Sequence, residues 1–133
     1  MSKIEFYFDE NMEPFETPIR EANSLHNTYD ILGTVSTIGR SAKDQDIVNY
    51  LRKRKNLTVI LTQDSDFVKR DLRKEIFTSN NTGVFVFSFK KGSKTWDKFI
   101  SITKIWDNLI KFSESNPPPF SYSVNSNGRI TKI

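Results

Sequence analysis

Aspartates in three separate stretches of the sequence have the residue type and spacing that could hold a divalent cation. Asp9 follows an apolar run, Asp44 precedes another, and Asp64 and Asp66 lie in the segment 58–67, TVILTQDSDF. Carboxylates brought close together repel one another, so they favour a cation between them. Oxygen-rich sites select hard ions such as Mg²⁺ or Mn²⁺, which polarise phosphoryl oxygens and generate hydroxide from water.

Few other side chains of the sequence suggest catalysis. There is no cysteine, which excludes a thiolate nucleophile, a disulfide and a cysteine-based zinc site. The one histidine, His26, lies early in an expected strand or loop, and a catalytic role for it is not favoured. Metal-assisted hydrolysis needs no side-chain nucleophile, so it suits this composition.

Length and composition indicate one soluble globular domain. The chain has 133 residues, of which 36% are hydrophobic and 27% charged. No apolar run approaches the roughly 18 residues of a membrane span, and residues 1–10 lack a signal-peptide pattern. We therefore expect a cytoplasmic protein without a membrane partner.

The charge is unevenly distributed along the chain. Residues 1–50 contain four basic and nine acidic side chains, a balance of −5, whereas the whole chain has a net charge of +4. The remainder of the chain is therefore strongly basic. This asymmetry fits an acidic pocket beside a surface that attracts a polyanion, and an ordinary solvated basic surface fits it equally well.

Hydrophobic periodicity predicts the elements that must position the aspartates. Strands are expected at 3–8, 26–35, 58–62 and 84–89, and helices at 12–25, 44–55, 67–77 and 95–112. Asn11 is expected to cap the first helix. In the last helix, Trp96, Ile100 and Trp106 fall at helical spacing and are expected in the core. Asn127-Gly128 is a turn signal for a terminal hairpin.

The alternation of strands and helices predicts an α/β fold. We expect a three-layer α/β/α sandwich with a mostly parallel central sheet, formed by residues 1–133 as a single domain, with a C-terminal β-hairpin at about 120–133. The carboxyl ends of parallel strands share one edge of the sheet, where ligands collect. This edge is expected to gather the acidic residues Asp9, Glu10, Asp44, Asp64 and Asp66.

Taken in order, the acidic motifs resemble those of the PIN-like domain family, in its short form related to VapC-type toxin ribonucleases. The opening FYFDEN at 6–11 looks like the first acidic segment of that family, DQDIV at 44–48 like the second, and TQDSDF at 62–67 like the third. The likeness covers nearly the whole chain. Pro18 within the first helix and a longer polar hairpin depart from the pattern.

The resemblance implies a PIN-like fold and an endoribonuclease, often the toxin of a toxin–antitoxin pair, that hydrolyses RNA with Mg²⁺ or Mn²⁺. It implies that Asp9, Asp44, Asp64 and Asp66 are the catalytic residues and metal ligands, with Glu10 as a secondary ligand. Water activated by the metal would then attack the phosphodiester in line and leave a 5′-phosphate and a 3′-hydroxyl.

Other side chains near the acidic motifs are candidates for substrate binding. We expect Thr62 or Asn11 to orient water or a ligating carboxylate. Arg40, Lys43 and Lys69 are candidate phosphate contacts, although each could equally be a solvated surface residue. The expected partners are RNA, a cognate antitoxin protein and a second copy of the chain in a homodimer.

Two alternatives stay open at this point. A non-catalytic PIN-like module would bind RNA or an antitoxin regardless of EDTA and would not cleave RNA under any metal. Phosphoryl transfer to an aspartate, as in receiver or phosphatase domains, is the other. Phosphatases of that kind need D-x-D after the first strand, where this chain has Asp9-Glu10-Asn11, but Lys90 and Lys91 follow a later strand as receivers require.

Overall fold

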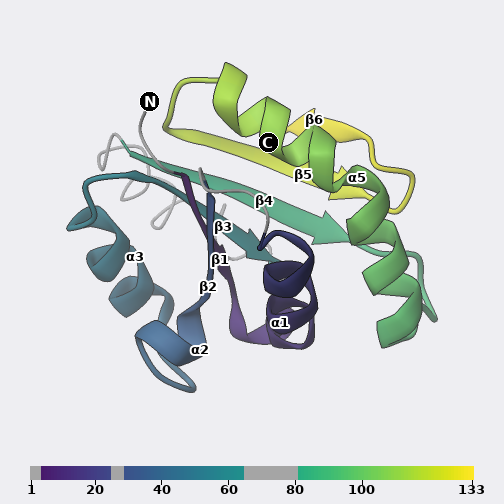
Figure 1. Ribbon diagram of the computed structural model, residues 1–133, viewed down its shortest axis with the longest axis horizontal. Helices are drawn as coiled ribbons and strands as arrows, with labels where there is room; N and C mark the ends of the chain where they lie inside the picture. The colour runs from purple at the N-terminus through teal and green to yellow at the C-terminus, as the bar shows by residue number, and fades with distance from the viewer. Residues whose placement is uncertain (1–3, 25–28, 65–80) are drawn as a thin grey trace.

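The computed structural model describes residues 4–24, 29–64 and 81–133, and its centre is a β-sheet (Figure 1). In the described residues the sheet has six strands in the order β2-β1-β3-β4-β5-β6. All neighbouring strands are parallel except β5 and β6, which form an antiparallel pair at one edge. The strands are β1 (Ile4–Phe8), β2 (Tyr29–Gly33), β3 (Leu57–Thr62), β4 (Thr82–Ser88), β5 (Phe120–Asn125) and β6 (Ile130–Lys132).

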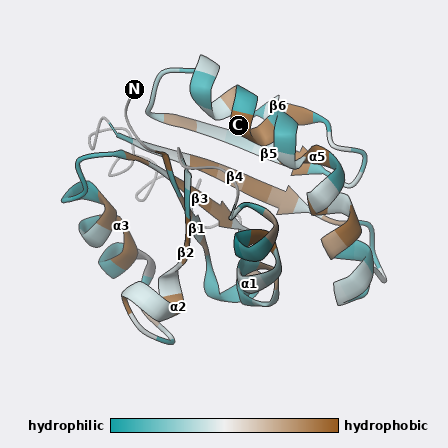
Figure 2. Cartoon of the chain, in the orientation of Figure 1, coloured by the Kyte–Doolittle hydropathy of each residue, from teal (hydrophilic) through white to brown (hydrophobic). Residues whose placement is uncertain are grey.

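Helices cover both faces of the sheet, which confirms the α/β class. α1 (Glu13–Ala22) and α5 (Thr95–Ser115) pack on one face, and α3 (Asp44–Arg52) packs on the other. Alternate residues of each strand point to opposite faces, so Phe6 and Phe8 join the α1–α5 core while Tyr7 joins the α3 core. In Figure 2, β3 and β4 are mostly hydrophobic, as expected for strands covered on both sides.

The connections between parallel strands do not all have the same hand. β1–α1–β2 and β4–α5–β5 use helices on the same face of the sheet, but they move across the sheet in opposite directions. They therefore have opposite hands, and one of them is the uncommon left-handed form. Because α5 lies on the same face as α1, its first turns are close to the chain that follows β1 and β3.

The strand register fixes which residues meet at the carboxyl edge. Phe8 of β1 pairs with Gly33 of β2 on one side and with Leu61 of β3 on the other. The next residue along each chain is Asp9, Thr34 and Thr62, respectively, so these three form one row across the sheet. The connection from β1 to β2 passes over the α1 face of the sheet, and the connection from β2 to β3 passes over the α3 face. This row is therefore the topological switch point, where α/β sheets bind ligands.

Two expectations about single helices are wrong. Asn11 does not cap α1: it lies in the short 3₁₀ helix η1 (Glu10–Met12), and Met12 occupies the cap position. Its side chain instead contacts the chain after β3. Of the expected core residues of α5, Trp106 is buried at 9% exposure, but Trp96 is 69% exposed and Ile100 is 36% exposed.

The exposure of Trp96 follows from its side of α5, which also carries the exposed Thr103, Asp107 and Glu114, and from the length of that helix. α5 has 21 residues and is about 30 Å long, whereas β4 beneath it has 7 residues and spans about 23 Å. The first turn of α5 therefore extends past the sheet. β2 ends at Gly33, two residues before the expected strand 26–35 does, because the short helix α2 (Thr34–Thr37) begins there, and the expected helix at 67–77 lies outside the described residues. Among the described helices, none combines the length and the hydropathy that a membrane span requires.

Candidate active site

The carboxylate of Asp9 lies at the switch point and is held from three directions. Asp9 is 7% exposed, and its backbone N–H donates to the carbonyl of Leu61 at 2.9 Å. The hydroxyl of Thr62 donates to Oδ2 at 2.8 Å, and the hydroxyl of Thr34 donates to Oδ1 at 3.3 Å. The Asn11 amide adds a long contact of 3.4 Å to Oδ2. Both carboxylate oxygens are thus oriented by residues at the end of β3 and in the helices that follow β1 and β2.

The residues after β1 and β3 are tied to each other by side-chain amides. Oδ1 of Asn11 accepts the backbone N–H of Gln63 at 3.0 Å, and the Gln63 amide donates to the Asn11 carbonyl at 2.7 Å. The backbone N–H of Asp64 donates to the Thr62 hydroxyl at 3.0 Å. The Thr62 hydroxyl therefore connects Asp9 to the backbone of Asp64, which is the arrangement expected of a residue that positions a ligating carboxylate.

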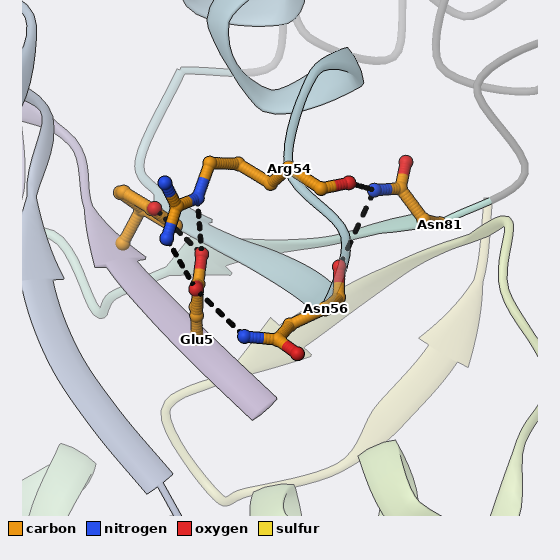
Figure 3. A network of polar contacts seen from close by, with 5 residues as sticks. Glu5, Arg54, Asn56 and Asn81 are labelled. Carbon is orange, nitrogen blue, oxygen red and sulfur yellow. Dashed lines mark hydrogen bonds and ion pairs between the residues drawn. The ribbon is translucent and has the colours of Figure 1, made fainter. Parts of the chain in front are cut away.

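A second buried acid, Glu5, shows how a structural carboxylate in this protein is satisfied. Glu5 is 1% exposed and lies on β1 at the opposite end of the strand from Asp9. Arg54 donates to its two oxygens at 3.0 and 2.7 Å, and Asn56 donates at 3.0 Å (Figure 3). Tyr7 adds a hydrogen bond of 2.8 Å.

The surroundings of Glu5 favour its charged form. Burial alone would raise the pKa of the Glu5 carboxyl, but the hydrogen bonds from Arg54, Asn56 and Tyr7 and the charge of Arg54 together bring that pKa below its ordinary value. The amide of Asn81 supports this arrangement by donating to the carbonyl of Arg54 at 2.6 Å (Figure 3). Glu5 and Arg54 thus form a closed ion pair, in which both carboxylate oxygens of Glu5 already accept hydrogen bonds.

Asp9 differs from Glu5 because the side chains that donate hydrogen bonds to it are uncharged. In the part of the chain that the structure describes, no lysine or arginine forms an ion pair with Asp9. A buried carboxylate without a cationic partner loses hydration that hydroxyls restore only in part. A bound cation would compensate for that loss. The donors present here, carboxylate and hydroxyl oxygens, are those that Mg²⁺ and Mn²⁺ prefer.

The remaining expected ligands are only partly described. Asp64 is half-buried two residues beyond β3, and Asp44 is the first residue of α3. Among the described residues, no three acids or histidines come close enough together to hold an ion. The side chain of Asp44 and the whole of Asp66 lie outside the description, as do Lys69 and His26. Their roles stay predictions.

Glu10 and Arg40 form a separate polar contact beside this edge. Oε1 of Glu10 accepts the backbone N–H of Ser41 at 2.6 Å. Arg40 pairs with Glu13 at 3.0 Å and approaches Glu10 to 4.0 Å. These contacts fix the loop before α3 against the start of α1, so Arg40 is partly neutralised where it lies. Lys43 is exposed directly before α3.

The sequence analysis did not identify Thr34, Gln63 and Lys98 as part of this site. Thr34 joins it only because β2 pairs with β1 in a register that sequence does not reveal. Lys98 of α5 donates to Oε1 of Gln63 at 3.1 Å, which requires the unusual placement of α5 on the α1 face. The sequence offered a signal only for Gln63, a polar residue directly after the expected strand 58–62.

The fold and the site define this chain as an α/β protein with a buried aspartate at the switch point of a mostly parallel sheet. The groups that donate hydrogen bonds to this aspartate are uncharged. Comparisons with known protein families, with curated proteins and with solved structures give no match. The resemblance to PIN-like domains therefore stays a prediction from the motifs.

Proposed function

We propose that this protein is a divalent-metal-dependent endoribonuclease of the toxin–antitoxin type. The observation that supports this proposal most is the environment of Asp9, a carboxylate at 7% exposure with oxygen and amide neighbours and no basic partner among the described residues. Such a carboxylate at the carboxyl edge of an α/β sheet is suited to receive a cation.

In this proposal Asp9 and Asp64 are metal ligands, and Asp44 and Asp66 complete the set. A bound Mg²⁺ or Mn²⁺ would supply Lewis acidity toward a phosphoryl oxygen and would favour ionisation of water at neutral pH. The chain supplies orientation. Thr62 and Thr34 hold the two oxygens of Asp9 in place before any ligand arrives, so the carboxylate loses little freedom when an ion binds.

The basic residues have a matching role in the proposal. Lys43 is exposed at the start of α3, close in sequence to Asp44, and would contact an RNA phosphate. Arg40 would do so only by exchanging its contact with Glu13 for the phosphate, since that contact is 3.0 Å long in the free protein. The basic excess outside residues 1–50 would attract the polyanion.

The test is cleavage of end-labelled single-stranded RNA by the purified chain with Mg²⁺, Mn²⁺ or EDTA. We expect cleavage with metal, none in EDTA, and products with 5′-phosphates. Asp9→Asn and Asp64→Asn should each lower the rate by about 100-fold or more, whereas Glu21→Gln, an exposed acid on α1, should match the parent protein. Circular dichroism would verify that each variant folds.

Two results would contradict the proposal. One is cleavage that persists in EDTA or is unchanged in both aspartate variants. The other is RNA binding without cleavage under any metal, which would identify a non-catalytic binding module instead. Covalent labelling of Asp64 by acetyl phosphate would point to phosphoryl transfer.

A further inference from the structure

The first turn of α5 presents an aromatic ring to solvent on a rigid support. Trp96 is 69% exposed, and its ring lies 5.9 Å from that of Phe99. Phe99 in turn stacks on Phe15 of α1 at 6.5 Å with an interplanar angle of 14°. Phe15 is buried in the core. Trp96 is therefore the outermost of three neighbouring rings, of which the innermost is buried, and its exposed side is open to a further ring.

Three lysines precede this ring in the loop between β4 and α5, and the structure gives them no acidic partners among the described residues. Lys90, Lys91 and Lys94 are exposed, and within the described ranges none of them forms an ion pair. The nearby carboxylate of Asp97 accepts a hydrogen bond from the backbone N–H of Lys94 at 3.0 Å and so caps the start of α5. A hollow of about 380 Å³ is lined by Lys90 and Lys91 together with Ser93, Asp97, Ser101 and Asn127.

This surface adjoins the candidate active site. The lysine loop follows β4, whose carboxyl end is at the same edge as Asp9 because β4 is parallel to β3 and β1. Lys98, two residues after Trp96, contacts Gln63, which is bonded to Asn11. A chain bound across Trp96 could thus continue toward Asp9 along the edge of the sheet.

We infer that Trp96, Lys90, Lys91 and Lys94 form a binding platform for single-stranded nucleic acid. A base stacks on the Trp96 ring, and the lysines contact the flanking phosphates. A duplex is a poorer ligand because its base faces are already covered by their neighbours. The inference deepens the proposed nuclease and rests on that function for the link between binding and cleavage.

The composition of the surface favours nucleic acid over a protein partner. In the described part of the chain, Trp96 and Ile100 are the large hydrophobic residues at the surface, which is little apolar area for the core of a protein interface. Lysine is depleted in such interfaces, whereas clustered lysine around an aromatic ring is the usual composition of a single-strand binding groove.

The experiment measures binding of a fluorescent oligouridylate to the full chain in EDTA, by anisotropy at several salt concentrations. Trp96→Ala should raise Kd by about 5-fold to 100-fold, while Trp96→Phe, which keeps a ring, should stay near the parent value. Because Trp106 is buried, quenching of the intrinsic fluorescence on binding should come from Trp96 and disappear in Trp96→Phe. A duplex of matched length should bind more weakly than the single strand.

Two double variants, each of which removes two positive charges, test whether the lysines near Trp96 contact the phosphates. Lys91→Gln with Lys94→Gln should lower the slope of log K against log salt by about 1.4, whereas Lys104→Gln with Lys111→Gln, exposed farther along α5, should leave it unchanged. Unchanged Kd in Trp96→Ala, equal binding of duplex, equal slopes in the two lysine pairs, or no binding at low salt would each overturn the inference.

The failure of this inference can be told apart from the failure of the proposed function. Platform-dependent binding in EDTA without cleavage in any metal would overturn the nuclease alone. Metal-dependent cleavage that Trp96→Ala leaves at the parent rate, at subsaturating RNA, would overturn the platform alone.

Discussion

The hydroxyl of Thr62, at the end of β3, lies 2.8 Å from Oδ2 of Asp9, which follows the neighbouring strand β1, and donates a hydrogen bond to it. The same hydroxyl accepts the backbone N–H of Asp64 at 3.0 Å. One small side chain therefore sets the position of a buried carboxylate and of the chain that carries the next aspartate.

Thr62→Val removes this hydroxyl but keeps the shape of the side chain. We expect metal-dependent cleavage to fall by about 10-fold to 100-fold, because Asp9 loses its shortest hydrogen bond. The stability should fall by about 1 kcal/mol, as measured by urea unfolding. Thr62→Ser retains the hydroxyl and should keep most of the activity. Equal activity in the valine and serine variants would show that the hydrogen bond does not serve the site.

Asp9→Asn tests whether the buried charge destabilises the metal-free protein. An amide can still accept from Thr62 and can donate to Thr34, and it removes an unpaired buried charge. We expect the variant to be more stable than the parent in EDTA by about 1 kcal/mol or more. Added Mn²⁺ should raise the melting temperature of the parent but not of Asp9→Asn. A variant that is less stable in EDTA would refute this account of Asp9.

The closed ion pair at the opposite end of β1 should affect stability but not chemistry. Arg54→Ala leaves the buried Glu5 carboxylate without its cation and should cost about 1–3 kcal/mol, since Arg54 itself is partly exposed. Lys53→Ala, at the neighbouring exposed position, should change stability by less than about 0.5 kcal/mol. Below its melting temperature Arg54→Ala should cleave RNA at the parent rate. A large loss of activity there would link the two ends of the sheet in a way that the structure does not explain.

The pH dependence of stability should report the same ion pair. The pKa of Glu5 is lower in the folded protein than its ordinary value of 4.5, so its ionised form favours folding. That contribution is complete above the unfolded pKa and is lost as the pH falls through the folded pKa. The parent should therefore lose stability from about pH 4.5 downward more steeply than Glu5→Gln. Urea unfolding at a series of pH values would show parallel curves if Glu5 did not contribute.

Gly83→Ala tests the close approach of β4 and β5. A Cβ at this position would lie 2.2 Å from Cζ of Phe120, whose ring is buried against Phe85 and Phe112. The ring cannot move away freely, so we expect a loss of about 1–3 kcal/mol. Ser88→Ala, at an exposed position of the same strand, should be neutral. Adding Phe120→Leu should restore part of the stability of Gly83→Ala, and a failure to do so would place the strain elsewhere.

The sequence was sufficient to predict the α/β class, because its strands and helices alternate with clear hydrophobic periods. It also placed Asp9 and Thr62 beside one edge, since both follow apolar runs that end there. The partnership of Thr34 with Asp9 could not be predicted, because it depends on the register of β2 against β1. Sequence specifies register through many weak side-chain contacts.

The errors have similar physical origins. Helical spacing assigned Trp96 to the core, but Trp96 lies on the side of α5 that carries the exposed Thr103, Asp107 and Glu114. Asn11 has a side chain typical of a helix cap, yet its amide has a better set of partners in Gln63 and Thr62. Both errors concern polar or aromatic residues at the carboxyl edge, where contacts between distant segments decide the local structure.

The central claim is that Asp9 holds a divalent ion, and anomalous scattering from crystals soaked in Mn²⁺ tests it most directly. We expect an anomalous peak about 2.0–2.2 Å from a carboxylate oxygen of Asp9, with further aspartates in the same coordination sphere, and no such peak in Asp9→Asn. A fully soaked crystal with no peak within coordination distance of Asp9 would contradict it.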